Sequence, residues 1–302
     1  MSQTKCPFTG SMVAVVTPFR DGKVDFTALD VLVERQIVAG QKAIVPCGST
    51  GESATLTHDE HAQVIEAVVA KADGRVSVIA GTGSNATAEA IDLTRAAESA
   101  GADGALLISP YYNKPTQDGI YEHYRAVAEA VQIPLITYNI PGRTGSTIET
   151  STLLRLSDID NIVAVKEATG SLDRVMDVVA ACGDKLAVLS GDDPLTLPMI
   201  SLGAVGLIST TANVAPREIA ELTELALEGR TAEASALHYR LLPLMRALFL
   251  ETNPIPVKAA VAMLGLCEDE LRLPLLTMSA EPRAILLSAM ERAGVASAGA
   301  TP

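Results

Sequence analysis

The feature that most constrains the fold is a regular alternation of short apolar runs with segments of helical periodicity. Eight apolar runs recur at roughly 30-residue intervals, and each one ends in small or polar residues. They span residues 12–18, 43–49, 76–84, 104–110, 134–141, 162–168, 186–192 and 205–213. Continuous apolar strands that alternate with helices indicate parallel βαβ units. Eight such units predict a (β/α)8 TIM barrel, with a doubly wound sheet as the alternative.

Two of the intervening helices carry recognisable end signals. Thr57 with Glu60 three positions later is a capping box, and Gly74 is a natural stop for the helix that follows. For the next helix, Asn85 is the predicted N-cap and Gly101 the predicted end.

The chain after Asn213 shows helical periodicity but no further strand pattern, and it is longer than one closing helix requires. We therefore predict a barrel over residues 1–224 that carries the site, and a C-terminal helical extension over residues 225–295. The small and polar residues 296–302 are expected to form a disordered tail.

Composition limits the classes of partner. Hydrophobic residues make up 48% of the 302 residues, which is enough for a large core, and the net charge of -13 argues against a nucleic-acid or anionic-membrane surface. No apolar run approaches the ~18 residues of a membrane span, and the N-terminus lacks a signal-peptide core. The cysteines form no CxxC pair, which fits a reducing compartment. A cytoplasmic location is expected. The cysteines are Cys6, Cys47, Cys182 and Cys267.

Polar and glycine-rich segments follow the predicted strands, where barrel enzymes place their sites. The strand order therefore brings one group of segments to a common mouth. It consists of Thr17 and residues 48–52, 81–85, 109–115, 138–145, 166–167, 190–193 and 210–213.

Lys166 is the residue in this group with the most specific chemistry. It lies within the sixth apolar run, although lysine is rarely buried because its ammonium is costly to desolvate. One interpretation is a lysine that reaches solvent or pairs with Glu167. The other is a buried amine with a lowered pKa, which attacks carbonyl compounds and forms an imine. We favour the imine, which needs no metal and no cofactor.

Four further residues at the mouth suit such chemistry. Ser49 and Thr50 lie in a glycine-rich segment that could bind a small carboxylate or form a plain turn. Tyr138 could relay protons near an imine or be a core tyrosine. Arg143 could bind a substrate carboxylate through two hydrogen bonds or lie on the surface.

The segment around His58 and His61 resembles a metal site because the two side chains share one helix face. It does not match HExxH, however, and no third ligand is evident nearby. We expect no metal here and interpret the segment as a solvated helix start.

Three motifs taken together resemble a known family. "GSTGE", "YNIPGRTG" and "VAVKEATG", in this order and at these strand ends, resemble the pyruvate-dependent class I lyases that include N-acetylneuraminate lyase and dihydrodipicolinate synthase. The resemblance extends over essentially the whole chain. Arg143 favours the dihydrodipicolinate synthase family within this superfamily, since the neuraminate lyases typically lack an arginine there.

The resemblance implies roles for the residues that bind and activate pyruvate. Lys166 would form a Schiff base with pyruvate, and Thr50, Tyr138 and Tyr112 would relay protons, with Tyr112 supplied by a neighbouring subunit. Ser49 stands where many family members have threonine, and the hydroxyl is kept. The other residues that the resemblance assigns to substrate binding are Thr50, Arg143, Gly191 and Ile208.

The implied reaction condenses pyruvate with L-aspartate 4-semialdehyde to give 4-hydroxy-tetrahydrodipicolinate, on the diaminopimelate route to lysine. Arg143 would bind the carboxylate of the semialdehyde, and the family is typically a homotetramer built from two tight dimers. The main alternative is another Schiff-base lyase, such as N-acetylneuraminate lyase or a keto-acid or sugar-acid aldolase. A metal-dependent class II aldolase and a non-catalytic sensor are further alternatives.

The resemblance also implies feedback inhibition by L-lysine at the interface of the tight dimer. Glu89 could pair with the amino group of lysine, while Asn85 and Tyr111 could hold its carboxylate. The matching residues are Ala54, His58, His61, Asn85, Glu89 and Tyr111.

Overall fold

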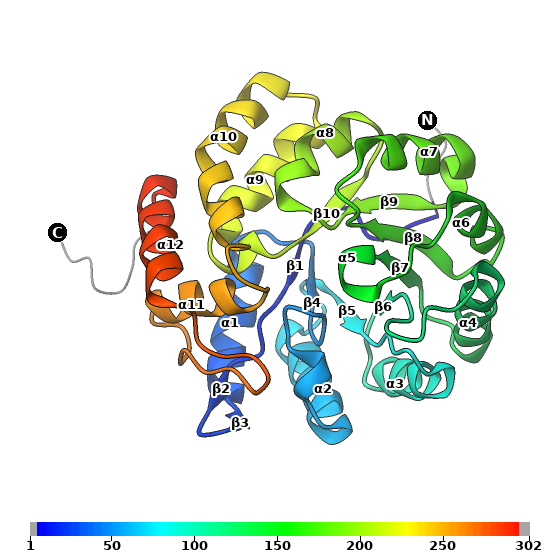
Figure 1. The fold of residues 1–302 in the computed structure, drawn as a ribbon, viewed down its shortest axis with the longest axis horizontal. Helices are drawn as coiled ribbons and strands as arrows, with labels where there is room; N and C mark the ends of the chain where they lie inside the picture. Colours follow the sequence, from blue (N-terminus) through cyan, green and yellow to red (C-terminus); the bar gives the residue numbers. More distant parts are fainter. Residues whose placement is uncertain (1–4, 296–302) are drawn as a thin grey trace.

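The computed structural model describes residues 5–295, in which eight parallel strands close into a barrel (Figure 1). All eight predicted strands are present, and each pairs with its neighbours in chain order, so the TIM barrel is confirmed and the doubly wound sheet is excluded. The barrel strands are β1 (Gly10–Ala14), β4 (Ala43–Val45), β5 (Ser77–Gly81), β6 (Gly104–Ile108), β7 (Leu135–Asn139), β8 (Ile162–Glu167), β9 (Ala187–Ser190) and β10 (Gly206–Ser209).

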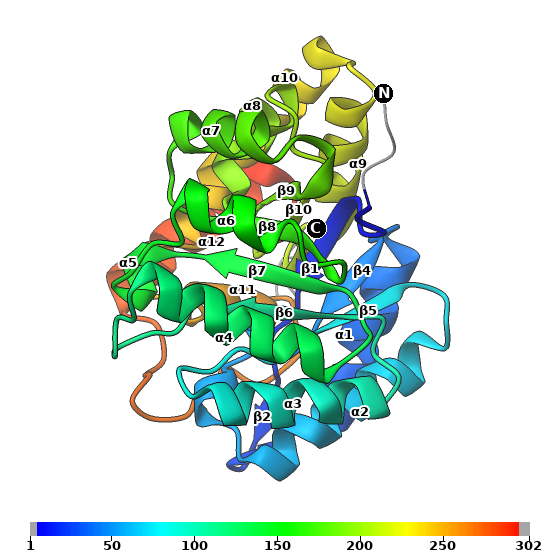
Figure 2. The same ribbon diagram turned by 90° about the vertical axis from the view of Figure 1, so that its right-hand side faces the viewer.

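A short antiparallel pair, β2 (Phe19–Arg20) and β3 (Lys23–Val24), lies outside the barrel and was not predicted. Two residues per strand are too few to produce an apolar run. Helices surround the strands, as Figure 2 shows for β7 and β8. The helices that follow the barrel strands are α1 (Phe26–Val38), α2 (His58–Ala72), α3 (Thr87–Ser99), α4 (Gln117–Ala130), α5 (Pro141–Thr144), α6 (Thr150–Leu156), α7 (Leu172–Cys182), α8 (Thr196–Ser201) and α9 (Pro216–Leu227).

The predicted ends of α2 are correct. The Thr57 hydroxyl accepts a hydrogen bond from the Glu60 amide at 3.2 Å, and the Glu60 carboxylate accepts one from the Thr57 amide at 3.0 Å. Gly74 follows the helix with a φ of 67°. Along residues 5–295, no helix has the length and apolarity needed to cross a membrane.

The N-cap predicted for α3 is wrong. The capping position is Ala86, and the Asn85 side chain instead donates to the carbonyl of Tyr111 at 3.1 Å. The helix begins one residue later than the sequence pattern indicated, and the Asn85 side chain holds the loop around Tyr111 instead. Gly101, with a φ of 90°, follows the end of the helix as predicted.

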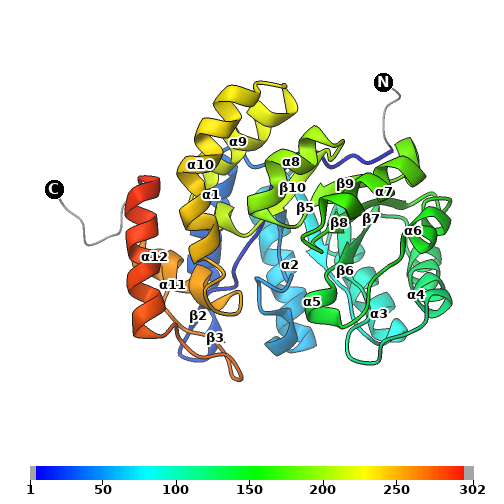
Figure 3. The ribbon, with the colours of Figure 1, turned by 45° about the horizontal axis from the view of Figure 1, so that its top comes forward.

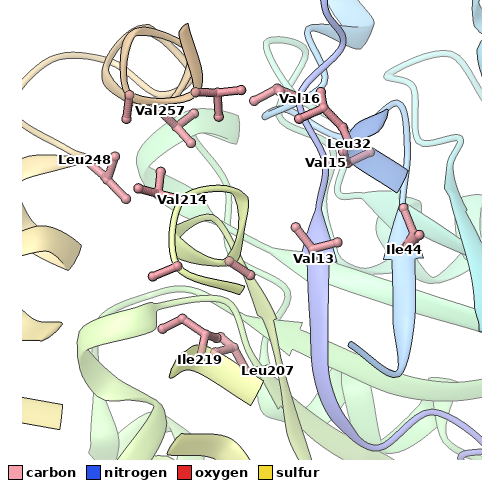
Figure 4. Packing of buried hydrophobic residues seen from close by; sticks show 14 of the residues in the cluster. Val13, Val15, Val16, Leu32, Ile44, Leu207, Val214, Ile219, Leu248 and Val257 are labelled. Atoms are coloured by element: carbon pink, nitrogen blue, oxygen red, sulfur yellow. The ribbon is translucent and has the colours of Figure 1, made fainter. Parts of the chain in front are cut away.

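Three more helices follow the barrel: the first packs against α9, and the last packs against the other two (Figures 1 and 3). They are α10 (Thr231–Ala247), α11 (Ile255–Met263) and α12 (Ala280–Ala293). Figure 4 shows Leu248 and Val257 in one buried cluster with the strand residues Val13 and Leu207. The boundary predicted at residue 225 falls within α9 and remains a prediction, and the tail 296–302 lies outside the described residues.

A buried ion pair also joins this C-terminal part to the barrel. Glu52, in the loop after β4, pairs with Lys258 of α11, and both side chains are shielded from solvent. Glu52 also accepts a hydrogen bond from the backbone amide of Arg272 at 3.3 Å, and the Lys258 amine lies 4.2 Å from the centre of the Phe19 ring. Desolvation lowers the pKa of Lys258, and Glu52 opposes that shift. The helical extension is thus held electrostatically to a loop at the barrel mouth.

We expect Lys258→Met to lower the free energy of unfolding by about 3–5 kcal/mol, because it leaves the Glu52 carboxylate buried without its cation. Urea unfolding at neutral pH measures this loss. The double variant Glu52→Gln, Lys258→Met should recover much of it, since no uncompensated charge remains. A single variant as stable as the parent chain would show that the pair does not stabilise this junction.

Candidate active site

A cavity of about 560 Å³ opens at the carboxyl ends of the barrel strands. The fold therefore brings together side chains that are far apart in the sequence. Six of the residues predicted for catalysis and substrate binding line this cavity: Ser49, Thr50, Tyr138, Arg143, Lys166 and Gly191.

Lys166 points into the barrel rather than to solvent. Its side chain is 6% exposed, and its neighbour on the strand, Glu167, points to the opposite face, as alternate residues of a strand do. There the Glu167 carboxylate accepts hydrogen bonds from the Asn139 amide and the Thr169 backbone, both at 2.9 Å. Pairing of Lys166 with Glu167, the other interpretation of this sequence, does not occur.

Burial changes the acid–base behaviour of Lys166. Desolvation lowers the pKa of its amine from 10.5 to about 8, with Arg143 lowering the pKa further and Asp193 raising it. Asp193 is itself buried and is held by the Ser209 hydroxyl and by the backbone amides of Thr210 and Thr211. Near pH 8, about half of the Lys166 amine is uncharged, against about 0.3% for an ordinary lysine. Lys166 can therefore act as a nucleophile.

Tyr138 is the lateral neighbour of Lys166. The two residues are paired in the register of β7 and β8, and the amine lies 4.4 Å from the centre of the Tyr138 ring. Desolvation raises the pKa of Tyr138 to about 12, so the phenol stays protonated and can donate a hydrogen bond or a proton. Tyr138 is buried like a core residue, and it also lines the cavity.

Gly191 provides the space that Lys166 occupies. A Cβ atom at Gly191 would lie 3.0 Å from Cε and 3.1 Å from Cγ of Lys166, closer than side chains normally pack. Ile208, which the family resemblance assigns to substrate binding, has its side chain in the inner barrel core and not among the residues that line the cavity.

The hydroxyl-bearing loop after β4 is a tight turn. The Gly51 amide donates to the Gly48 carbonyl at 3.0 Å, and the Glu52 amide donates to the Ser49 carbonyl at 3.2 Å. This turn sets the Ser49 and Thr50 side chains at the cavity. The loop therefore has the tight turn and the two hydroxyl groups expected of a loop that binds a carboxylate.

Asn253 is a cavity residue that the sequence analysis missed. Its side-chain amide donates to the Thr50 hydroxyl, and its backbone carbonyl accepts from the Arg143 guanidinium, both at 2.9 Å. Asn253 precedes α11, far from any strand end, so no pattern in the sequence marked it. Arg143 itself lies exposed at the mouth, on the short helix α5.

Tyr112 lies apart from this group. Its side chain is 89% exposed and is not among the residues that line the cavity, although the adjacent Tyr111 is. The backbone of Tyr112 is left-handed, with a φ of 74°. Within one chain, Tyr112 is therefore not assembled with Lys166, Tyr138 and Thr50.

A second polar group lies in the same cavity. His58 contacts Glu89 at 2.8 Å, and Glu89 also accepts from the Ser84 hydroxyl. His61 is buried against the Gly81 carbonyl at 2.8 Å, and desolvation lowers its pKa, which keeps the ring neutral. Of the residues implied by the resemblance, Ala54, His58, His61, Glu89 and Tyr111 line the cavity, while Asn85 holds the backbone of Tyr111.

Comparison with known proteins gives a consistent result. Residues 7–293 match the dihydrodipicolinate synthetase family. A protein of Pelobacter propionicus named 4-hydroxy-tetrahydrodipicolinate synthase is 54% identical over 288 residues, which are 95% of this chain and 99% of that protein.

Two solved structures share the fold and were obtained with small molecules. A chloride-inhibited dihydrodipicolinate synthase of Acinetobacter baumannii, complexed with pyruvate, superposes with a TM-score of 0.94 at 47% identity, covering 95% of this chain and 99% of that one. The enzyme of Cyanidioschyzon merolae, with lysine bound, gives a TM-score of 0.92 at 41% identity, covering 95% and 98%.

The pKa of Lys166 predicts a pH dependence for its reaction with a 2-keto acid. The rate of reductive trapping of pyruvate should rise with pH to a midpoint near 8, because only the uncharged amine attacks the carbonyl. Arg143→Gln removes a positive charge that lowers this pKa, so the midpoint should move to higher pH. The surface variant Arg155→Gln is the control and should leave the midpoint unchanged. A midpoint near 10.5 in the parent chain would contradict the lowered pKa.

Proposed function

The chain belongs to the dihydrodipicolinate synthetase family, and from this membership we propose that it condenses pyruvate with L-aspartate 4-semialdehyde to give 4-hydroxy-tetrahydrodipicolinate. Membership makes it a lyase of lysine and diaminopimelate biosynthesis. The observation that carries the proposal is the buried Lys166 amine, which has a lowered pKa and lies beside Tyr138 in a cavity with a hydroxyl-bearing loop.

In the first half of the proposed reaction, the Lys166 amine attacks the carbonyl carbon of pyruvate. Proton transfers then release water and leave an imine. Ser49 and Thr50 hold the pyruvate carboxylate, and Tyr138 stays protonated in the apolar barrel, so it can deliver the protons that the departing water needs. Loss of a proton from the methyl group converts the imine to an enamine, whose terminal carbon is the nucleophile of the next step.

In the second half, the enamine carbon attacks the aldehyde carbon of the semialdehyde, and the enamine electrons form the new carbon–carbon bond while the imine re-forms. The π bond of the aldehyde C=O breaks, and its oxygen takes a proton to become a hydroxyl. Arg143 at the mouth is placed to bind the semialdehyde carboxylate through two hydrogen bonds. The amine of the bound product then attacks the imine carbon and displaces Lys166, which closes the ring and restores the free amine.

In this proposal, Tyr112 acts in the active site of a neighbouring subunit. Its exposed side chain suits a residue that completes the site of a neighbouring subunit, and we include it as the third member of the relay on that basis. The homotetramer and the cytoplasmic location stay predictions.

We also propose that L-lysine inhibits the enzyme through the second polar group. The Glu89 carboxylate could exchange its contact with His58 for the ammonium of a ligand, and Tyr111 lines the same cavity. The lysine-bound relative from Cyanidioschyzon merolae supports lysine as the ligand class.

Reduction with borohydride in the presence of pyruvate should add one pyruvate-derived group to the chain, located on Lys166 by peptide mapping. Lys166→Met should give no adduct and should lose at least about 10³-fold in turnover, because the covalent step is absent. Intact-mass measurement and a coupled assay with aspartate semialdehyde test both expectations. An unmodified parent chain would refute the mechanism. Turnover of N-acetylneuraminate instead of the semialdehyde would favour the other lyase.

Millimolar L-lysine should lower the steady-state rate. Glu89→Gln should raise the lysine concentration needed for half-inhibition at least about tenfold, because the carboxylate that pairs with the ligand ammonium is lost. Glu98→Gln, at the far end of α3, is the matched control and should keep the parent sensitivity. Rates that do not change at millimolar lysine would exclude this regulation.

A further inference from the structure

Asn253 connects two groups that the proposed reaction uses. The residue is 6% exposed and lines the cavity from the segment between α10 and α11. Its side-chain amide donates to the Thr50 hydroxyl, and its backbone carbonyl accepts from Arg143. One residue of the C-terminal part therefore contacts both a proposed member of the proton relay and the proposed carboxylate-binding arginine.

The contact with Thr50 has a defined direction. The Nδ2 atom of an asparagine can only donate, so the Thr50 oxygen is the acceptor in this hydrogen bond. A threonine hydroxyl has a single hydrogen, and that hydrogen cannot lie on the side that faces Asn253. It is therefore left for an acceptor other than Asn253, and Thr50 lines the same cavity as Lys166 and Tyr138.

The neighbouring ion pair keeps this contact in place. Glu52 belongs to the same loop as Thr50, and Lys258 belongs to the helix that begins just after Asn253. The buried pair between them joins the two segments. The two segments are thus joined at two positions, by this ion pair and by the hydrogen bond between Asn253 and Thr50.

We propose that Asn253 is a positioning residue that sets the direction in which the Thr50 hydroxyl transfers its proton. The inference rests on the proposed function and deepens it, because it adds a residue of the C-terminal part to the relay. Asn253 acts through Thr50 and does not touch the reacting atoms.

The informative variant is Asn253→Asp, which keeps the size of the side chain. The introduced carboxylate can only accept, so it draws the Thr50 hydrogen towards itself and reverses the direction of the hydroxyl. We expect kcat to fall roughly 10²-fold at pH 8, within the range that a positioned proton transfer contributes. Thermal unfolding, followed in parallel, checks that the variant is folded.

The pH profile separates this mechanism from a charge effect. While the introduced carboxyl is ionised, a reversed Thr50 hydroxyl should lower kcat by a factor that does not change with pH. A negative charge that acted only on the Lys166 amine would instead raise the pKa of that amine and make the deficit grow as pH falls over the same range. Protonation of the carboxyl at lower pH removes both effects, so the comparison is made above the pKa of the carboxyl. A deficit that grows as pH falls over that range overturns the proposal.

A double-mutant cycle with Thr50→Val gives a second readout. Once the hydroxyl is gone, Asn253→Asp should change kcat less than about threefold, because its effect passes through Thr50. An equal loss in both backgrounds overturns the proposal. A kcat of Asn253→Asp within twofold of the parent value also overturns it. That result would mean that Asn253 already presents its oxygen, not its NH2 group, to Thr50.

Two controls complete the test. Asn161→Asp changes an amide that donates to the Ala128 and Val131 carbonyls, at the opposite end of β8, and should leave kcat unchanged. Asn253→Ala adds no charge and carries the test if the Asp variant does not fold. It should lower kcat without a change in the pH profile, and a parent-like kcat overturns the proposal.

Trapping of pyruvate distinguishes a failure of the proposed function from a failure of the role assigned to Asn253. If the parent chain forms no adduct on Lys166, the proposed function fails. If the parent forms the adduct and the Asn253 variants behave like the parent, only the inference about Asn253 fails.

Discussion

The desolvation of one amine is the constraint on which the site depends. An ammonium ion is costly to place inside a barrel of aliphatic side chains, and the amine responds by losing its proton more readily. Asp193 raises the pKa of this amine and so limits the shift, while Arg143 lowers the pKa further. The missing side chain at Gly191 leaves room for the lysine chain at this depth. Burial, charge and space together give a nucleophile that operates near neutral pH.

The same apolar environment acts in opposite directions on the two paired residues. It favours the uncharged form of each, which lowers the pKa of Lys166 and raises that of Tyr138 to about 12. Neighbouring groups whose pKa values are driven apart can take different acid–base roles in one site. The register of β7 and β8 places them side by side, so a single feature of the sheet provides both the nucleophile and a protonated partner.

The sequence predicts those parts of the structure that depend on local pattern. Eight apolar runs were enough for the barrel, and the place of Lys166 within one of them favoured a buried amine without fixing its direction. The contact between Lys166 and Tyr138 needs the register of two strands. The contacts of Asn253 and Lys258 join segments separated by 203 and 206 residues, which no periodicity records. Asn85 is not the helix cap, since α3 begins after Ala86, and its side chain bonds to the distant carbonyl of Tyr111, a contact that only the folded chain reveals.

The junction between the barrel and its last helices has a consequence for protein engineering. A chain cut after α9 would lose the cation that faces Glu52 and the wall of apolar side chains around Leu248 and Val257. It would also lose the amide that contacts Thr50. The eight strands are therefore not a minimal scaffold that could be excised and fused elsewhere. Any redesign of this enzyme has to carry the whole polypeptide as one unit.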